Sequence, residues 1–147
     1  MRAIAKLLKT CRSIAVVGLS PKPDRTSHAV AAYLQQHGYR IIPVNPQAAG
    51  QQILGETCYA SLQEAAAAAL QAGSTIDIVN VFRKSEDVPP VLADTLAMAK
   101  QAGVQGFWLQ LGISHPESEK HAADAGLAVV ANRCIKVELA SLKLAGD

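Results

Sequence analysis

The residues best suited to binding chemistry lie in one polar segment, GLSPKPDRTS. Gly18 opens it and permits close backbone approach, and Thr26 or Ser27 can cap a helix whose first amides would face an anion. Lys22 and Arg25 add positive charge to the same stretch. The segment therefore predicts a phosphate-binding loop, although loops between a strand and a helix often contain such residues.

Cysteine chemistry has one candidate. Cys134 follows a predicted strand and precedes a predicted helix, where the helix dipole could make a thiol reactive. The simpler interpretation is a small residue packed under the last helix. The three cysteines, Cys11, Cys58 and Cys134, are widely spaced and form neither a disulfide framework nor a metal motif.

Acid–base catalysis has weaker support. No paired acid–base groups stand out, and none of the four histidines lies in a recognisable catalytic context. We therefore predict no catalytic residue and no metal site. His28, the histidine nearest the polar segment, is the one to test.

The elements that would position these residues alternate between strand and helix. Apolar runs predict strands, and Ser61–Glu64 and Ser114–Glu117 resemble capping boxes that start helices. The expected strands are Ser13–Val17, Tyr39–Val44, Ile76–Phe82, Gly106–Leu111 and Leu127–Ala131. The expected helices cover Ala3–Lys9, Thr26 to Gly38, Ser61 to Gln71, Pro89 to Gly103, Ser114 to Gly126 and Ile135–Leu144. This alternation predicts an α/β fold: a Rossmann-like three-layer α/β/α sandwich around a five-stranded, mainly parallel sheet.

Length and composition narrow the class of protein. A chain of 147 residues, half of them apolar, fits a single domain over 1–147. Its net charge of +2 gives no case for nucleic-acid binding. No apolar run approaches the roughly 20 residues of a membrane helix, and the start does not resemble a signal peptide, so we expect a cytoplasmic protein without a membrane partner. A homodimer is compatible with the composition but not required by it.

An ordinary nicotinamide site is the first ligand to consider for such a sheet. In open α/β sheets, ligands bind outside the carboxyl ends of the strands. Only Gly18 stands where the dinucleotide fingerprint needs three glycines, and the second strand ends in Val44-Asn45-Pro46 rather than in an acidic residue. The sequence therefore argues against NAD.

Six motifs in order carry a family resemblance: AVVGLSPKPDRTS, IIPVNP, ILGE, VNVFRKSEDVP, FWLQLGI and NRC. From Ser13 to Leu142 the chain resembles the small stand-alone CoA-binding domain family, which is itself similar to the CoA-binding domain of the succinyl-CoA synthetase alpha subunit. The resemblance implies that the cofactor is coenzyme A, bound as CoA or as an acyl-CoA.

The resemblance also implies where each part of CoA would lie. The phosphate-facing loop would use Gly18, Ser20, Lys22 and Ser27. Pro23 and Arg25, in the same loop, are further candidate binding residues. The adenosine would lie beside Asn45 and Pro46, and the nucleotide cleft would be lined by Val81, Phe82, Arg83 and Val88. The pantetheine path would pass Gln110 and Gly112, and the last segment would be Asn132, Arg133 and Cys134.

One departure and three alternatives stay open. Pro46-Gln47-Ala48 lacks the basic residue that follows the second strand in the synthetase domain, so Arg83 or Lys22 would have to meet the 3′-phosphate of CoA. We expect a non-catalytic or regulatory binding module. The alternatives are a thiol-dependent or acyl-CoA-processing enzyme using Cys134, a binder of another adenine nucleotide, and a subunit-type interaction module.

Three residues inside the predicted strands also need an explanation. We expect Trp108 to be a core or subunit contact rather than a platform for adenine. Asp77 and Asn80 are unusual for a buried strand, and either an edge position or a hydrogen-bonded site would account for them.

Overall fold

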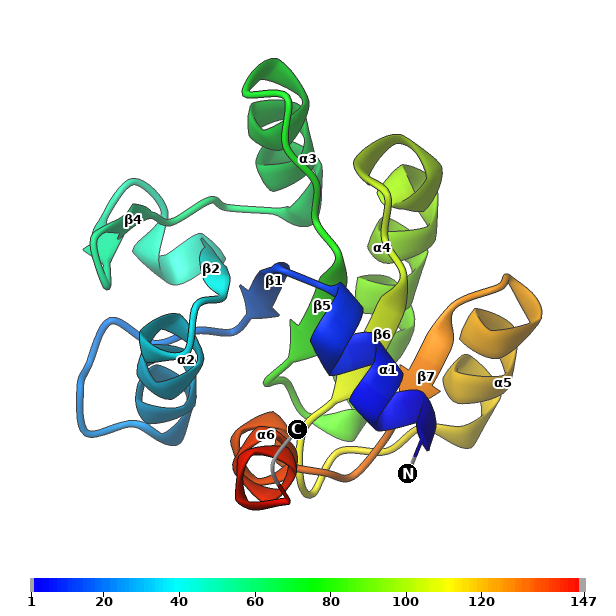
Figure 1. The fold of residues 1–147 in the computed structure, drawn as a ribbon. Coiled ribbons are helices and arrows are strands. Elements are labelled where there is room, and N and C mark those ends of the chain that lie inside the picture. Colours follow the sequence, from blue (N-terminus) through cyan, green and yellow to red (C-terminus); the bar gives the residue numbers. More distant parts are fainter. Residues whose placement is uncertain (1, 146–147) are drawn as a thin grey trace.

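Five parallel strands form the central sheet of the protein (Figure 1). The computed structural model describes residues 2–145, so positions 1, 146 and 147 of the expected 1–147 domain lie outside the described part. The sheet order is β2-β1-β5-β6-β7, so the chain crosses over between β1 and β5, where such sheets bind ligands. This confirms the predicted Rossmann-like α/β class. The strands are β1 (Ser13–Val17), β2 (Arg40–Val44), β5 (Ile78–Val81), β6 (Gly106–Leu109) and β7 (Ala128–Val130).

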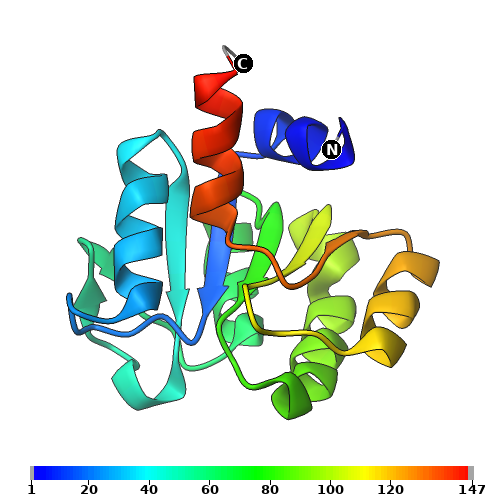
Figure 2. The ribbon, with the colours of Figure 1, turned by 90° about the horizontal axis from the view of Figure 1, so that it is seen from below.

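Helices cover both faces of the sheet (Figures 1 and 2). Side chains alternate along β1, so that Ile14 and Val16 face one layer while Ala15 and Val17 face the other. The first layer contains α1 (Arg2–Thr10), α2 (Thr26–Gln36) and α6 (Ile135–Leu144). The second contains α3 (Leu62–Gln71), α4 (Val88–Ala102) and α5 (Pro116–Asp124).

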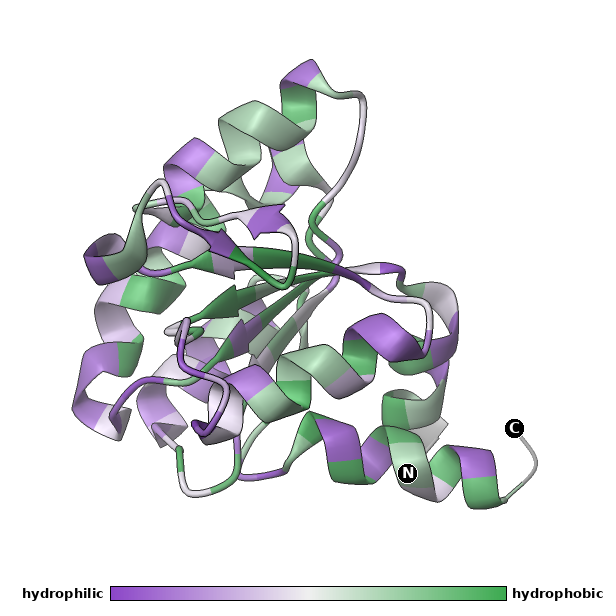
Figure 3. Cartoon of the chain, turned by 90° about the vertical axis from the view of Figure 1, so that its left-hand side faces the viewer, coloured by the Kyte–Doolittle hydropathy of each residue, from purple (hydrophilic) through white to green (hydrophobic). Residues whose placement is uncertain are grey.

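Apolar side chains fill the space between these layers, and most of the central sheet is green in Figure 3. Trp108 is fully buried, and its indole N–H donates to the Arg133 carbonyl at 2.8 Å, so it is a core residue. Within residues 2–145, no helix is both long enough and apolar enough to cross a membrane.

The segment after β2 has more structure than its sequence suggests. It lies outside every strand and helix expected from the sequence, yet it holds a short 3-10 helix, η1 (Pro46–Ala48), and a small antiparallel hairpin of β3 (Gln52–Ile53) and β4 (Glu56–Thr57). Strands of two residues are too short to leave an alternating pattern in the sequence.

The observed strand and helix ends differ from expectation at several positions. The third strand of the sheet begins at Ile78, so Asp77 precedes it. A 3-10 turn, η2 (Ser85–Asp87), precedes α4, whose first turn contains Pro89 as expected.

Of the two predicted caps, Ser61 is confirmed and Ser114 is wrong. The Ser61 hydroxyl accepts the Glu64 N–H at 3.2 Å. The Glu64 carboxylate accepts the Ala60 N–H at 3.4 Å rather than the Ser61 N–H, so only half of the predicted box forms. At α5 the cap is His115, whose Nδ1 accepts the Ser118 N–H at 3.3 Å, and not Ser114. Proline is favoured at the first helical position, so Pro116 sets the cap one residue later than predicted.

Candidate functional site

The loops after β1 and β5 approach so closely that only glycine fits at position 18. A Cβ on Gly18 would lie 2.3 Å from the Phe82 carbonyl oxygen, and the residue adopts φ +91°. Its N–H donates to the Val44 carbonyl at 2.8 Å, while the Phe82 N–H donates to the Val17 carbonyl at 2.8 Å. The absence of a side chain at Gly18 therefore allows the carboxyl ends of β1, β2 and β5 to lie close together.

The start of α2 differs from the predicted cap. Arg25, and neither Thr26 nor Ser27, is the residue before the helix, and no side chain caps it. The Ser27 hydroxyl instead accepts the Ser20 N–H at 3.0 Å, and the Ser20 hydroxyl accepts the Lys22 N–H at 3.1 Å. The Ser20 and Ser27 hydroxyls thus form hydrogen bonds within the loop. No side-chain acceptor occupies the amino end of α2, where the backbone N–H groups and the positive end of the helix dipole lie.

A pocket of about 340 Å³ lies between this loop and the end of β2. We call it the first-loop pocket. The Asn45 side chain joins its two walls, because its Nδ2 donates to the Leu19 carbonyl at 3.0 Å and its Oδ1 accepts the Gln47 N–H at 3.0 Å. The lining residues are Ser20, Pro21, Lys22, Arg25, Asn45, Gln47 and Ala48.

A second pocket of about 410 Å³, here called the Cys134 pocket, begins on the other side of the α2 start. Its walls combine apolar side chains with the charged Arg83 and Lys84. Cys134, from the loop after β7, lies at one end of it. Arg25 lines the first-loop pocket and its neighbour Thr26 lines this one, so the two pockets adjoin. The lining residues are Thr26, Phe82, Arg83, Lys84, Gln110, Leu111, Ile113 and Cys134.

The loops after β6 and β7 are hydrogen-bonded to each other beside the Cys134 pocket. The Gly112 N–H donates to Asn132 Oδ1 at 2.7 Å, and the Asn132 N–H donates to the Ile113 carbonyl at 3.1 Å. Asn132 adopts φ +58°, a conformation that asparagine tolerates better than most residues. These bonds fix the turn that leads into Cys134.

A buried amide pair anchors the start of α6. Gln110 Oε1 accepts the Ile135 N–H at 3.3 Å and the Asn80 Nδ2 at 3.4 Å. Asn80 lies on the central strand and is fully buried, which excludes the edge position. Its Oδ1 is the one buried side-chain oxygen or nitrogen of the described residues without a partner. The pair ties β5 and β6 to the residue that follows Cys134.

The three cysteines differ in exposure. Cys134 is partly exposed, whereas Cys11 and Cys58 are buried. Burial raises the pKa of both buried thiols, and the nearby Asp77 charge raises that of Cys11 further. The accessible thiol is therefore the one in the pocket wall.

Asp77 lies at the amino ends of the strands, opposite the two pockets, where its carboxylate forms hydrogen bonds to neighbouring segments. It accepts the Arg12 N–H at 2.7 Å, the Ser13 N–H at 3.2 Å and the Thr75 hydroxyl at 2.7 Å. Burial alone would raise the pKa of Asp77, but these hydrogen bonds outweigh it and the pKa lies below its usual value. Asp77 therefore belongs to the hydrogen-bonded alternative left open by the sequence.

The structure brings eight of the residues expected at the site to pocket walls. They are Ser20, Lys22, Arg25 and Asn45 in one pocket and Phe82, Arg83, Gln110 and Cys134 in the other. Gly18, Ser27, Gly112, Asn132 and Arg133 lie in the loops that shape the walls, and Pro23 and Pro46 also stand outside both linings. Val81 and Val88 are fully buried core residues.

Sequence reasoning missed Thr26, Lys84, Leu111 and Ile113 as wall residues, although all four stand inside the quoted motifs. His28 lines neither pocket, and the described residues contain no group of three side chains suited to a metal ion.

Comparisons with known proteins agree with the fold and with the family resemblance. A family model described as a CoA binding domain matches residues 12–140. The protein named Uncharacterized protein YneT of Bacillus subtilis (strain 168) is 40% identical over 140 residues, which span 95% of this chain and 94% of that protein.

Two solved structures share both sequence and fold with this chain. A Thermus thermophilus protein described as cell-free ID.343 is 38% identical with a TM-score of 0.83, covering 96% of this chain and 97% of that one. A hypothetical protein from Pyrococcus horikoshii OT3 is 34% identical with a TM-score of 0.78, covering 93% and 87%.

Proposed function

This chain belongs to the CoA-binding domain family, and we propose that it binds CoA or an acyl-CoA across the two pockets at the carboxyl ends of the strands. We propose further that it acts as a non-catalytic or regulatory module. The observation that carries the proposal is the pair of adjoining pockets, one basic and one partly apolar, with the start of α2 between them.

The phosphates of CoA would bind in the first-loop pocket. Lys22 and Arg25 supply positive charge there, and the start of α2 adds amide donors and a positive dipole end. Gly18 has no side chain, which allows the loop to run close to β5 beneath the ligand.

The pantetheine arm would extend into the Cys134 pocket. Phe82, Leu111 and Ile113 offer apolar contacts to its hydrocarbon parts, and Gln110 offers a polar group to its amides. The thiol, or a short acyl group on it, would then reach the Cys134 end.

The 3′-phosphate lacks the basic partner that the second strand supplies in the synthetase domain. Gln47 stands in the first-loop pocket together with Lys22 and Arg25. Arg83 lines the other pocket. We propose that Lys22 takes the place of the missing basic residue.

Calorimetric titration with CoA, dephospho-CoA, acetyl-CoA, NAD and ATP tests the proposal. We expect saturable binding of the CoA species and weaker binding of NAD and ATP. Absence of measurable heat and of any thermal shift with every CoA species would contradict it.

A second candidate function is a thiol-dependent reaction at Cys134. Its basis is that Cys134 is the accessible cysteine of the described residues and directly precedes α6. This function requires the Cys134 thiol to alkylate faster than a free model thiol at neutral pH. A rate equal to or below that of the model thiol would remove it.

A further inference from the structure

A third pocket lies at the amino ends of the strands, at the opposite end of the sheet from the proposed CoA site. Its volume is about 350 Å³, at the small end of the range of ligand sites. It is built from α1, the turn between α2 and β2, and α6, which pack together although α1 and α6 come from opposite ends of the chain (Figures 1 and 2). We call it the amino-end pocket.

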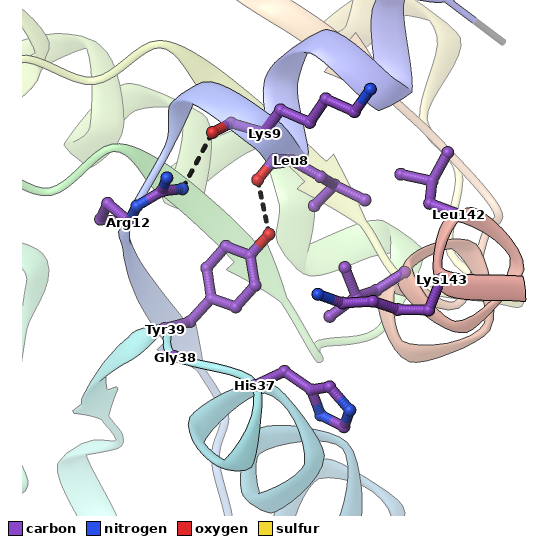
Figure 4. A pocket seen from close by; sticks show the side chains of 9 residues that line it. Leu8, Lys9, Arg12, His37, Gly38, Tyr39, Leu142 and Lys143 are labelled. Carbon is purple, nitrogen blue, oxygen red and sulfur yellow. Dashed lines mark hydrogen bonds between the residues drawn. The ribbon is translucent and has the colours of Figure 1, made fainter. Parts of the chain in front are cut away.

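The inner wall of the amino-end pocket is apolar. Leu8 and Leu139 are buried, and Leu142 is half-buried. The Tyr39 hydroxyl donates to the Leu8 carbonyl, so the phenol is satisfied within the protein and its ring forms part of the wall (Figure 4). A ligand would therefore meet hydrocarbon on this side.

The rim of the pocket carries basic side chains. Arg12, His37 and Lys143 line it from three different segments, and Lys9 adds a fourth basic side chain. No aspartate or glutamate of the described residues is among the lining residues. A concave surface with charges of one sign concentrates ions of the opposite sign.

Local contacts hold two of these basic groups in place. Arg12 Nη1 donates to the carbonyls of Lys9 and Cys11, both at 2.9 Å. The His37 Nδ1 lies 2.8 Å from the Tyr33 carbonyl, which only accepts, so Nδ1 carries the hydrogen. In Figure 4 the Lys143 side chain extends across the pocket toward Tyr39.

Two carboxylates of the described residues, those of Asp77 and Glu138, have partners outside the rim. The Asp77 carboxylate accepts the backbone N–H groups of Arg12 and Ser13, below the pocket. Glu138, on α6, pairs with Arg133 at 3.5 Å. Neither carboxylate lines the rim.

We propose that the amino-end pocket is a second binding site, specific for a small organic anion with a carboxylate or phosphate on a compact apolar body. The anionic group would lie at the rim with Lys143, Arg12 and His37. The apolar body would pack on Leu8, Tyr39 and Leu139. The site is separate from the CoA pockets, with which it shares no lining residue.

Backbone amide NMR of the full chain, with and without CoA, tests this proposal. The probes are phenyl phosphate and benzoate, which separate the two anionic groups, and uncharged benzamide as the matched control. We expect saturable shifts at Gly38, Tyr39 and Leu139 with at least one anion and none with benzamide. Added CoA should leave them in place.

Substitutions at the rim complete the test. Lys143→Gln, at an exposed position, should weaken the bound anion about fivefold or more, as loss of a charged hydrogen bond predicts. Arg12→Gln should act in the same direction. Lys100→Gln removes the same charge from an exposed site on α4 and should leave the affinity unchanged. Shifts confined to Ser20–Arg25, shifts that do not saturate, or equal weakening by Lys100→Gln would each overturn the proposal.

Discussion

Gly18→Ala tests the close approach on which the CoA site is built. The new Cβ would lie 2.3 Å from the Phe82 oxygen, a separation that real Cβ atoms do not tolerate, so one strand end must move by about 0.7 Å or more to reach 3.0 Å. Overpacking of this kind costs about 1–3 kcal/mol. The left-handed conformation at φ +91° costs an alanine about another 1–2 kcal/mol.

Gly126→Ala is the matched control. Gly126 adopts φ +95° but has nothing within 4 Å of its virtual Cβ, so alanine there meets the backbone cost without the clash. We therefore expect Gly18→Ala to lower the free energy of unfolding by about 2–5 kcal/mol and Gly126→Ala by about 1–2 kcal/mol.

Urea unfolding and CoA calorimetry on both variants measure the two effects. CoA affinity should fall at least about tenfold for Gly18→Ala, because a misplacement near 1 Å is enough to disrupt a bound geometry. Gly126→Ala should bind CoA normally. Equal losses of stability in the two variants, or unchanged CoA affinity in a folded Gly18→Ala protein, would refute the reasoning.

Three further predictions concern single side chains. Lys22→Gln should weaken CoA about tenfold while weakening adenosine little, since it removes a phosphate contact; equal loss for both ligands in calorimetry would argue against that role. Iodoacetamide labelling followed by mass spectrometry should modify Cys134 before Cys11 and Cys58, whose thiols are buried with raised pKa values; early labelling of a buried cysteine would contradict the assignment. Because the folded-state pKa of Asp77 is lowered, its ionised form stabilises the protein above about pH 4, and this contribution is lost as the pH falls through the folded-state pKa. Asp77→Asn should thus lower the free energy of unfolding by about 1–3 kcal/mol at pH 7 and by less in acid, as urea unfolding at both pH values would show; a difference that does not vary with pH would contradict it.

The sheet could be predicted from sequence because its inner strands β1, β5 and β6 are buried on both faces. Segments such as Ser13–Val17 are continuous apolar runs bounded by turn residues, a pattern that identifies a parallel strand locally. The order of strands in space and the short hairpin at Gln52–Thr57 depend on contacts between distant segments, which the periodicity of one segment does not contain.

The candidate site was predictable to a similar degree. The loop motifs predicted Lys22, Arg25 and Cys134 to lie together because each follows a strand and all parallel strands end at the same edge, and all three line the two pockets. The helix cap was placed wrongly, since Ser27 bonds Ser20 seven residues earlier instead of its own helix. The amino-end pocket left no signal in the sequence, because it exists only where α1 and α6 pack together.

A co-crystal structure with CoA is the most direct test of the central claim. The account predicts the diphosphate against Arg25 and the start of α2, the 3′-phosphate against Lys22, and the pantetheine arm in the Cys134 pocket with its sulfur at the Cys134 end. CoA bound with its diphosphate away from the Gly18–Arg25 loop, or with its thiol directed away from Cys134, would contradict the account.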